Sequence, residues 1–239
     1  MNIQTNQSLS VDCVVFGFNG QTLKVLLIKQ QNLKDTTYKL PGSMILEDET
    51  LPCAAIRVLE EMTALRNVYL RQTTIFSDPN RLTPRELNWI NEYHKIATKR
   101  VVTVGYYALV KLDEKIIKHT TSKGAHWAVV DSIKHLAMDH KLILADALDV
   151  LCNELISSPI AFELLPRKFT IRELQTLYSA ILGVEIDNRN FRKKVLTCQF
   201  LIPTGEKEKA VAHKPAQYYT FNKTAYNKTR INKFKLGFL

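Results

Sequence analysis

The chain has 239 residues, long enough for two compact domains. Its hydrophobic content of 46% and charged content of 23% exclude a disordered or fibrous protein. Most of the net charge of +10 lies in the last third: residues 159–239 carry 15 Lys and Arg against 6 Asp and Glu, whereas residues 1–158 carry 18 against 17. This asymmetry predicts a C-terminal module that binds a polyanion, with a basic solubilising tail as the alternative.

The sequence gives no sign of a membrane or secreted protein. It contains no apolar run of about 18 residues, and residues 1–10 lack the basic start and apolar stretch of a secretory signal. The four cysteines form no CxxC pair, and His135 and His140 match no compact metal spacing. We therefore expect a cytoplasmic protein without membrane contact, bound metal or cofactor.

Residues 1–157 read as an α+β domain. Apolar runs at 9–18 and 22–29 flank Asn19-Gly20, which predicts a tight hairpin because both residues tolerate a positive φ. Apolar residues at three- and four-residue spacing predict a helix over 50–65. The other expected elements are strands at 67–76, 100–112 and 125–130, a helix opened by a capping box at 83–86 and running to about Ile96, and a helix at 141–155.

Ser157-Ser158-Pro159 marks the expected boundary with a second domain, residues 158–239. A capping box at 170–173 opens a helix that Gly183 ends, and Asp187 caps a second helix over 188–198. Strands expected at 200–203 and 217–221 enclose a basic loop. Helix, short turn, helix and hairpin is the order of a winged helix.

The second helix of this pair predicts a DNA-reading surface. Arg189, Arg192 and Lys193 fall within an arc of about 100°, opposite the apolar Phe191 and Val195. Arginine suits guanine and asparagine suits adenine, while lysine mainly neutralises phosphate. A merely solvated basic face is the alternative. The expected DNA-contacting residues are Thr170, Arg172, Asn188, Arg189, Asn190, Arg192, Lys193, Lys194, and, on the hairpin, Lys207, Lys209, His213 and Lys214.

Residues 42–65 resemble a damaged Nudix box. Glu49, Arg57 and Glu61 occupy their positions in that motif, whereas Ser43 and Ala64 stand where glycines belong. Arg57 and Glu61 form an i, i+4 pair, for which a structural salt bridge is favoured over a ligand contact.

Two further departures remove carboxylates from the box. In the Nudix family, glutamates at the positions of Val58, Glu61 and Met62 hold Mg²⁺, and neither an isopropyl nor a thioether group supplies the oxygen that this ion needs. The resemblance thus implies a Nudix-like fold that is not an enzyme. A Nudix hydrolase with an accessory DNA-binding domain is the alternative.

The run from Asp187 to Lys194, with residues 164–166 and 169–175, resembles the C-terminal domain of Nudix-related transcriptional regulators. The resemblance implies a Nudix-like α/β/α sandwich followed by a winged helix-turn-helix domain, in a homodimer that binds palindromic double-stranded DNA operators and a small-molecule effector. In this family some members sense ADP-ribose or related NAD metabolites, and others sense sugars such as arabinose. The damaged box and the strand at 16–18 favour a regulator of sugar catabolism, with a pentose as the effector. A sensor of ADP-ribose or another NAD metabolite is the alternative.

The effector is expected in the Nudix-like domain. The candidate contacts are Phe16, Tyr38, Lys39, Glu49, Arg57, Glu61, Arg100 and His126. Residues 78–99 depart from the family pattern, because about twenty residues separate Asp78-Pro79 from Lys99-Arg100. Three roles remain open for this insertion: a lid over the ligand cleft, a piece of dimer interface, or simple packing on the domain, which is favoured.

Overall fold

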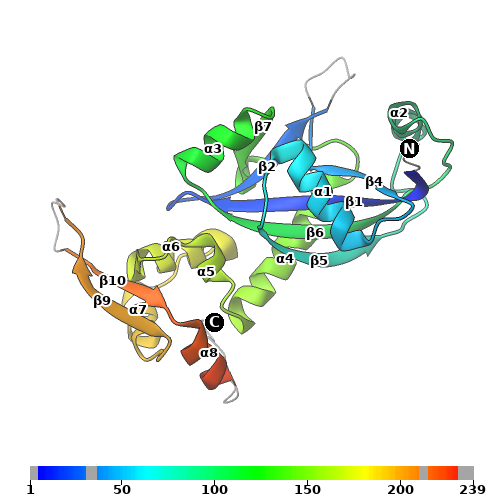
Figure 1. Ribbon diagram of the computed structural model, residues 1–239. Helices are drawn as coiled ribbons and strands as arrows, with labels where there is room; N and C mark the ends of the chain where they lie inside the picture. The colour runs from blue at the N-terminus through cyan, green and yellow to red at the C-terminus, as the bar shows by residue number, and fades with distance from the viewer. Residues whose placement is uncertain (1–4, 31–36, 210–214, 231–239) are drawn as a thin grey trace. The chain divides into compact units, whose positions relative to one another are not determined.

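The computed structural model describes residues 5–30, 37–209 and 215–230 (Figure 1). The described chain up to Val150, apart from the turn at 18–23, forms one compact unit, and Leu151 onward forms a second unit together with that turn. The division falls inside helix α4 (His140–Ser157), so this helix contributes residues to both units. The domain boundary expected at Ser158 stays a prediction. Within the described ranges, no helix has the length and apolarity needed to cross a membrane.

A seven-stranded sheet forms the centre of the first unit. Its main path runs β3-β2-β1-β6-β5, with β4 added on β1 and β7 on β2. The strands are β1 (Thr5–Phe18), β2 (Leu23–Lys29), β3 (Tyr38–Lys39), β4 (Gly42–Leu46), β5 (Tyr69–Phe76), β6 (Val102–Lys111) and β7 (Ala125–Val129). The strands expected at 67–76, 100–112 and 125–130 are confirmed, whereas β3 and β4 were not expected from the sequence.

Helices cover both faces of the sheet, because successive side chains of a strand point to opposite sides. On β1, the Cys13 thiol contacts the carbonyl of Ala55 in helix α1 (Leu51–Thr63), and the neighbouring Asp12 faces His140 at the start of α4. Figure 1 shows α1 lying across the sheet. The α/β/α layering implied by the family resemblance is therefore confirmed.

The β1–β2 hairpin differs from the expected tight turn. Four residues connect the strands, and of these only Gly20 has a positive φ, at 92°. The side-chain oxygen of Asn19 accepts hydrogen bonds from the backbone N–H groups of Gln21 and Thr22. The hairpin itself is confirmed, but its connection is longer than a two-residue turn, and the asparagine side chain helps to close it.

The inserted segment between β5 and β6 folds as helix α2 (Pro84–His94). Thr83 and Glu86 form the expected capping box, and the helix ends at Lys95, earlier than Ile96. Leu82 and Ile90 of this segment are buried in a small apolar cluster with Met44 and Val101. The inserted segment therefore packs on the domain, and its possible roles as a lid or a dimer interface stay predictions.

Helix α3 (Glu114–Thr121) was not expected from the sequence. Asp113 caps its first turn by accepting a hydrogen bond from the Ile116 N–H at 2.7 Å. Thr120 accepts a hydrogen bond from the Trp127 indole at 2.9 Å, and Trp127 is almost fully buried. Trp127 is thus a core residue. A short 3₁₀ helix (Val130–Ser132) follows β7.

The second unit contains a winged helix. Its elements are α5 (Ala161–Leu164), β8 (Phe169–Thr170), α6 (Ile171–Leu182), α7 (Asn188–Leu196), β9 (Leu201–Lys207), β10 (Gln217–Phe221) and α8 (Lys223–Arg230). The sheet order is β8-β10-β9. The capping box at Thr170, the left-handed Gly183 and the Asp187 cap are all confirmed. Strand β9 is longer than the expected 200–203, and α5 and α8 were not expected.

Local and tertiary contacts agree in fixing the position of α7. Phe191 and Val195 are buried on its inner face, and the Phe191 ring meets the Tyr178 ring of α6 edge-on at 5.6 Å. The Asp187 side chain accepts a hydrogen bond from the Asn190 N–H at 2.8 Å and so starts the helix. One face of α7 is therefore anchored, and the opposite face is left outside the core.

Candidate functional site

The exposed face of α7 carries the cations that its sequence predicted. Arg189, Arg192 and Lys193 are exposed, as are Asn188, Asn190 and Lys194. These side chains surround the first two turns of a helix whose other side is held by Phe191 and Val195. The second helix of a helix-turn-helix pair is the element that enters the major groove in such proteins. The geometry therefore suits contact with a nucleic acid.

The remaining candidates for DNA contact differ in their exposure. Thr170 is only 2% exposed, and its hydroxyl is engaged in the capping box with Glu173, so its side chain has a structural role. Arg172 is exposed on the first turn of α6, and Lys207 and Lys209 are exposed at the end of β9 and just beyond it. His213 and Lys214 lie outside the described residues.

The damaged Nudix box is held together by Arg57. Its Nε and Nη2 donate to the two carboxylate oxygens of Glu49 at 2.8 and 2.9 Å, and Nη2 also donates to the carbonyl of Met44 at 3.1 Å. The bond to Glu61 is longer, at 3.3 Å. The structural salt bridge favoured for Arg57 is confirmed, but Glu49 is its main partner.

The donor set of the box does not fit a magnesium ion. Val58 of α1 is fully buried in the core, and Glu49 forms an ion pair with Arg57. Glu60 pairs with Arg66, and Glu61 is exposed. In the ranges that the structure describes, no three His, Cys, Asp or Glu side chains are grouped to hold a metal ion.

A cavity of about 40 Å³ lies inside the first unit, where β1, β4 and β6 meet the inserted segment. Of the eight candidate effector residues, Lys39 alone lines it. Its other walls come from β1, β4, β6, the α2 segment and the start of α4. The lining is Ser10, Asp12, Lys39, Gly42, Ser43, Met44, Arg81, Leu82, Trp89, Ile90, His94, Val101, Thr103, Met138 and His140.

The other candidate residues lie away from this cavity. Phe16 is fully buried in the core, with its ring 6.4 Å from that of Tyr107. Arg100 donates to the carbonyl of Ser77. Tyr38 and His126 lie side by side, with ring centroids 5.4 Å apart. Glu49, Arg57 and Glu61 belong to the ion-pair cluster of the box described above.

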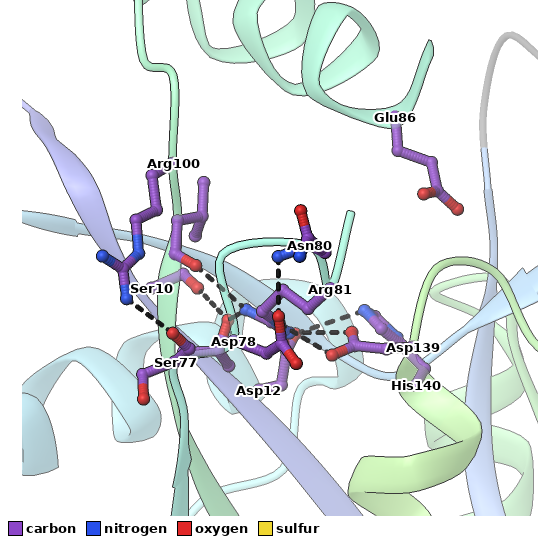
Figure 2. A network of polar contacts seen from close by, with 12 residues as sticks. Ser10, Asp12, Ser77, Asp78, Asn80, Arg81, Glu86, Arg100, Asp139 and His140 are labelled. Carbon is purple, nitrogen blue, oxygen red and sulfur yellow. Dashed lines mark hydrogen bonds and ion pairs between the residues drawn. The ribbon is translucent and has the colours of Figure 1, made fainter. Parts of the chain in front are cut away.

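Arg81, one of the residues that line the cavity, forms a buried ion pair with Asp139. The Nε and Nη2 atoms of Arg81 donate to the two carboxylate oxygens of Asp139, both at 2.7 Å, and both side chains are 7% exposed (Figure 2). Nη1 donates to the hydroxyl of Thr103, which in turn shares a 2.7 Å hydrogen bond with Ser10. Arg81 follows a turn in which the Asp78 carboxylate accepts a hydrogen bond from the Asn80 N–H, and the Asp78 carbonyl accepts one from the Arg81 N–H.

Asp12, Lys39 and His140 form a second buried polar group beside the ion pair. Burial raises the pKa of Asp12 to about 6, while the nearby cations Lys39 and Arg81 oppose this rise. Burial lowers the pKa of Lys39, and it lowers the pKa of His140 to about 3. His140 is neutral, since its Nδ1 accepts a hydrogen bond from the Leu40 N–H at 2.8 Å.

Gly42 permits the close approach of Asp12 to β4. A Cβ atom at position 42 would lie 1.6 Å from the Asp12 carboxylate, so any larger residue would displace this side chain. The glycine therefore helps to fix one acidic group in the cavity wall.

Sequence reasoning missed Asp12, Arg81, Asp139 and His140. The signal for Asp12 was an acidic residue within an otherwise apolar strand, since a buried carboxylate needs a specific partner. Arg81 follows the Asp78-Pro79 turn, but nothing local indicates that its partner lies 58 residues further along the chain.

The neutral state of His140 predicts a pH-dependent stability. The unfolded chain binds a proton at His140 below pH 6.5, whereas the folded protein does so only near pH 3, so stability is lost as the pH falls through this window. Between pH 7 and 5 this loss is about 2 kcal/mol. His140→Gln, which keeps an acceptor for the Leu40 N–H, should flatten the fall in unfolding free energy by that amount in urea titrations. The exposed His135→Gln is the control, and parallel profiles for His140→Gln and the unchanged protein would contradict the assignment.

Comparisons with known proteins agree with this architecture. A family model described as the NrtR DNA-binding winged helix domain matches residues 161–221. The ADPR responsive transcriptional repressor NtrR of Acinetobacter baylyi is 30% identical over 220 residues, which cover 89% of this chain and 81% of that protein.

Solved structures give the same result. The crystal structure of Shewanella oneidensis NrtR complexed with a 27mer DNA has a TM-score of 0.72 and 28% identity, covering 92% of this chain and 95% of that one. A MutT/nudix family protein from Enterococcus faecalis shares the fold, with a TM-score of 0.63, 23% identity, and coverage of 93% and 89%. The chain therefore belongs to the NrtR family, in which a Nudix-like domain precedes a winged-helix DNA-binding domain.

Proposed function

We propose that the protein is a transcriptional repressor that binds double-stranded DNA through its winged helix and responds to an ADP-ribose-like effector. The observation that carries this proposal is the exposed cationic face of α7 in a chain whose relative is named an ADPR responsive repressor. The Shewanella oneidensis relative has been crystallised with DNA. The basic excess of residues 159–239 supplies the electrostatic attraction that such binding needs.

In this proposal different side chains contact the bases and the phosphates of the DNA. Arg189 and Arg192 contact base edges from the first turns of the helix, and Asn188 and Asn190 assist them there. Lys193, Lys194 and Arg172, with Lys207 and Lys209 of the hairpin, neutralise phosphates. Two copies in a homodimer would present two such helices to the half-sites of a palindromic operator.

The effector is assigned to the nucleotide class rather than to the sugars. The named relative responds to ADP-ribose, and the sugar interpretation has no counterpart among the relatives described above. The cavity presents the cations Arg81 and Lys39, which suit the charged pyrophosphate of a nucleotide better than a neutral sugar. These observations favour the ADP-ribose alternative over sugar catabolism.

The small size of the cavity favours movement on binding. Its volume of about 40 Å³ is far below the roughly 300 Å³ of a pocket for a drug-sized ligand. The α2 segment forms one wall through Leu82, Trp89 and Ile90, and it packs on the domain through the small cluster around Met44 and through the Arg81–Asp139 ion pair. We assign to it a second role as the lid that opens for the effector.

The proposal treats the Nudix-like domain as a sensor without hydrolase activity. Val58 and Met62 replace two metal-binding glutamates of the family motif, and the remaining Glu49 is held by Arg57. The bound nucleotide would therefore leave the cavity unchanged, as a reversible signal requires.

The DNA assignment is tested with a duplex selected in vitro from a random library by the unmodified protein. Arg189→Ala and Arg192→Ala should each weaken binding of this duplex by about 1–3 kcal/mol in fluorescence anisotropy, with the melting temperature unchanged. The matched control is Arg85→Ala, an exposed arginine on α2. Unchanged affinity in both α7 variants would refute the role of this helix.

The effector assignment is tested by thermal shift with ADP-ribose, NAD and arabinose, each with and without Mg²⁺. ADP-ribose should raise the melting temperature in a saturable way, because a ligand of the folded state stabilises it. Chromatography of the same samples should recover the ADP-ribose intact. A shift with arabinose instead would restore the sugar interpretation, and Mg²⁺-dependent loss of ADP-ribose would restore the hydrolase.

A further inference from the structure

We propose that an anionic group of the effector displaces the Asp139 carboxylate from the Arg81 guanidinium. We propose further that this exchange couples occupancy of the cavity to the conformation of helix α4. The inference rests on the proposed function, because it takes the pyrophosphate of an ADP-ribose-like ligand as the incoming anion. It goes further by naming the contact that the ligand breaks.

Arg81 cannot receive an anion in its present state without losing a partner. Its guanidinium makes four hydrogen bonds, two to Asp139 and one each to Thr103 and the carbonyl of Val101. The bidentate pair with Asp139 uses the same planar fork that binds phosphate oxygens. A phosphate and the Asp139 carboxylate are thus alternative occupants of one face of Arg81.

The charges around the cavity also favour replacement of the Asp139 carboxylate by the ligand anion. Two basic side chains at the cavity, Arg81 and the half-buried Lys39, are matched by two nearby carboxyl groups, Asp12 and Asp139, and the neutral His140 adds no charge. The two negative charges of a pyrophosphate added to this set would leave an excess of negative charge, which is costly at low dielectric. Separating Asp139 from Arg81 removes one competing negative charge from the guanidinium and so reduces this cost.

Asp139 is the carboxylate that is free to leave. Asp12 lies in the interior of β1, where Gly42 of β4 closes against it. Asp139 instead lies in the connection before α4, next to Met138, whose φ of 54° is unfavourable for a residue with a side chain. Movement of this connection would relieve that strain, whereas movement of Asp12 would break the sheet.

The same residue forms the first turn of α4. The carbonyl of Asp139 accepts hydrogen bonds from the N–H groups of Leu142 and Ile143, at 2.8 and 3.3 Å. Helix α4 then continues to Ser157, and its residues from Leu151 onward belong to the unit that contains the winged helix. A displaced Asp139 therefore alters the start of a helix that both units share.

Two substitutions separate this exchange from a purely structural ion pair. Asp139→Asn keeps the shape of the side chain but removes the competing charge, so it should bind ADP-ribose at least about fivefold more tightly in isothermal titration calorimetry. Arg81→Gln should bind at least about fivefold more weakly, because the anion contact is lost. The matched control is Glu60→Gln, which removes a carboxylate from the exposed pair with Arg66 and should change nothing.

Opposite effects of the two substitutions support the exchange. If the ion pair only stabilised the fold, both variants would lose affinity together, and that result would overturn the proposal. Should Asp139→Asn fail to fold, hydrogen exchange of the unmodified protein decides. ADP-ribose should then accelerate exchange at the Leu142 and Ile143 amides, and slower exchange there would overturn the proposal.

Failure of the proposed function remains distinguishable from failure of this inference. If the unmodified protein binds no ADP-ribose, the effector assignment fails, and inorganic pyrophosphate becomes the probe. Pyrophosphate should still bind more tightly to Asp139→Asn than to the unmodified protein and more weakly to Arg81→Gln. Equal or weaker binding by Asp139→Asn would overturn the exchange itself.

Discussion

The Arg81 guanidinium is buried in a unit whose core is otherwise largely apolar, and its ion pair with Asp139 organises one side of the cavity. A buried charge is tolerated only with a partner. The half-buried Lys39 donates to the carbonyl of Gly42 and lies near the buried Asp12. The two carboxyl groups come from β1 and from the residue before α4, while Arg81 comes from the inserted segment. The charges thereby hold together three parts of the chain that have no regular hydrogen-bonding ladder in common.

This arrangement explains how a damaged Nudix box can remain useful. Two positions at which the Nudix motif has glutamates are Val58 and Met62, and the Arg57–Glu49 pair of the box supports the backbone of Met44 in the cavity wall. The box helix α1 therefore contributes to the structure of a neighbouring pocket.

The DNA-binding unit was largely predictable from the sequence, because its signals are local. Thr170, Gly183 and Asp187 begin and end helices through contacts within a few residues, and the apolar spacing of α7 identified its buried face. The short helices α5 and α8 escaped prediction, because they carry neither a clear cap nor a long periodic stretch.

The cavity was not predictable in the same way. Arg81 and Asp139 are 58 residues apart, and Asp12 and His140 are still further apart, so only the tertiary fold brings each pair together. Phe16 and Arg100 were expected to contact the effector. A strand pattern and a family resemblance do not specify on which side of the sheet a ligand lies. Lys39 was found because it adjoins the loop before the box.

The central claim is that effector occupancy and DNA binding are energetically coupled. It is tested most directly by measuring the ADP-ribose dissociation constant twice, for the free protein and for its complex with the selected duplex. For a repressor released by its effector, ADP-ribose should bind the DNA complex more weakly, by the same factor by which saturating ADP-ribose weakens DNA binding. Equal ADP-ribose affinity in the two states would contradict the account, because a ligand without differential affinity cannot regulate.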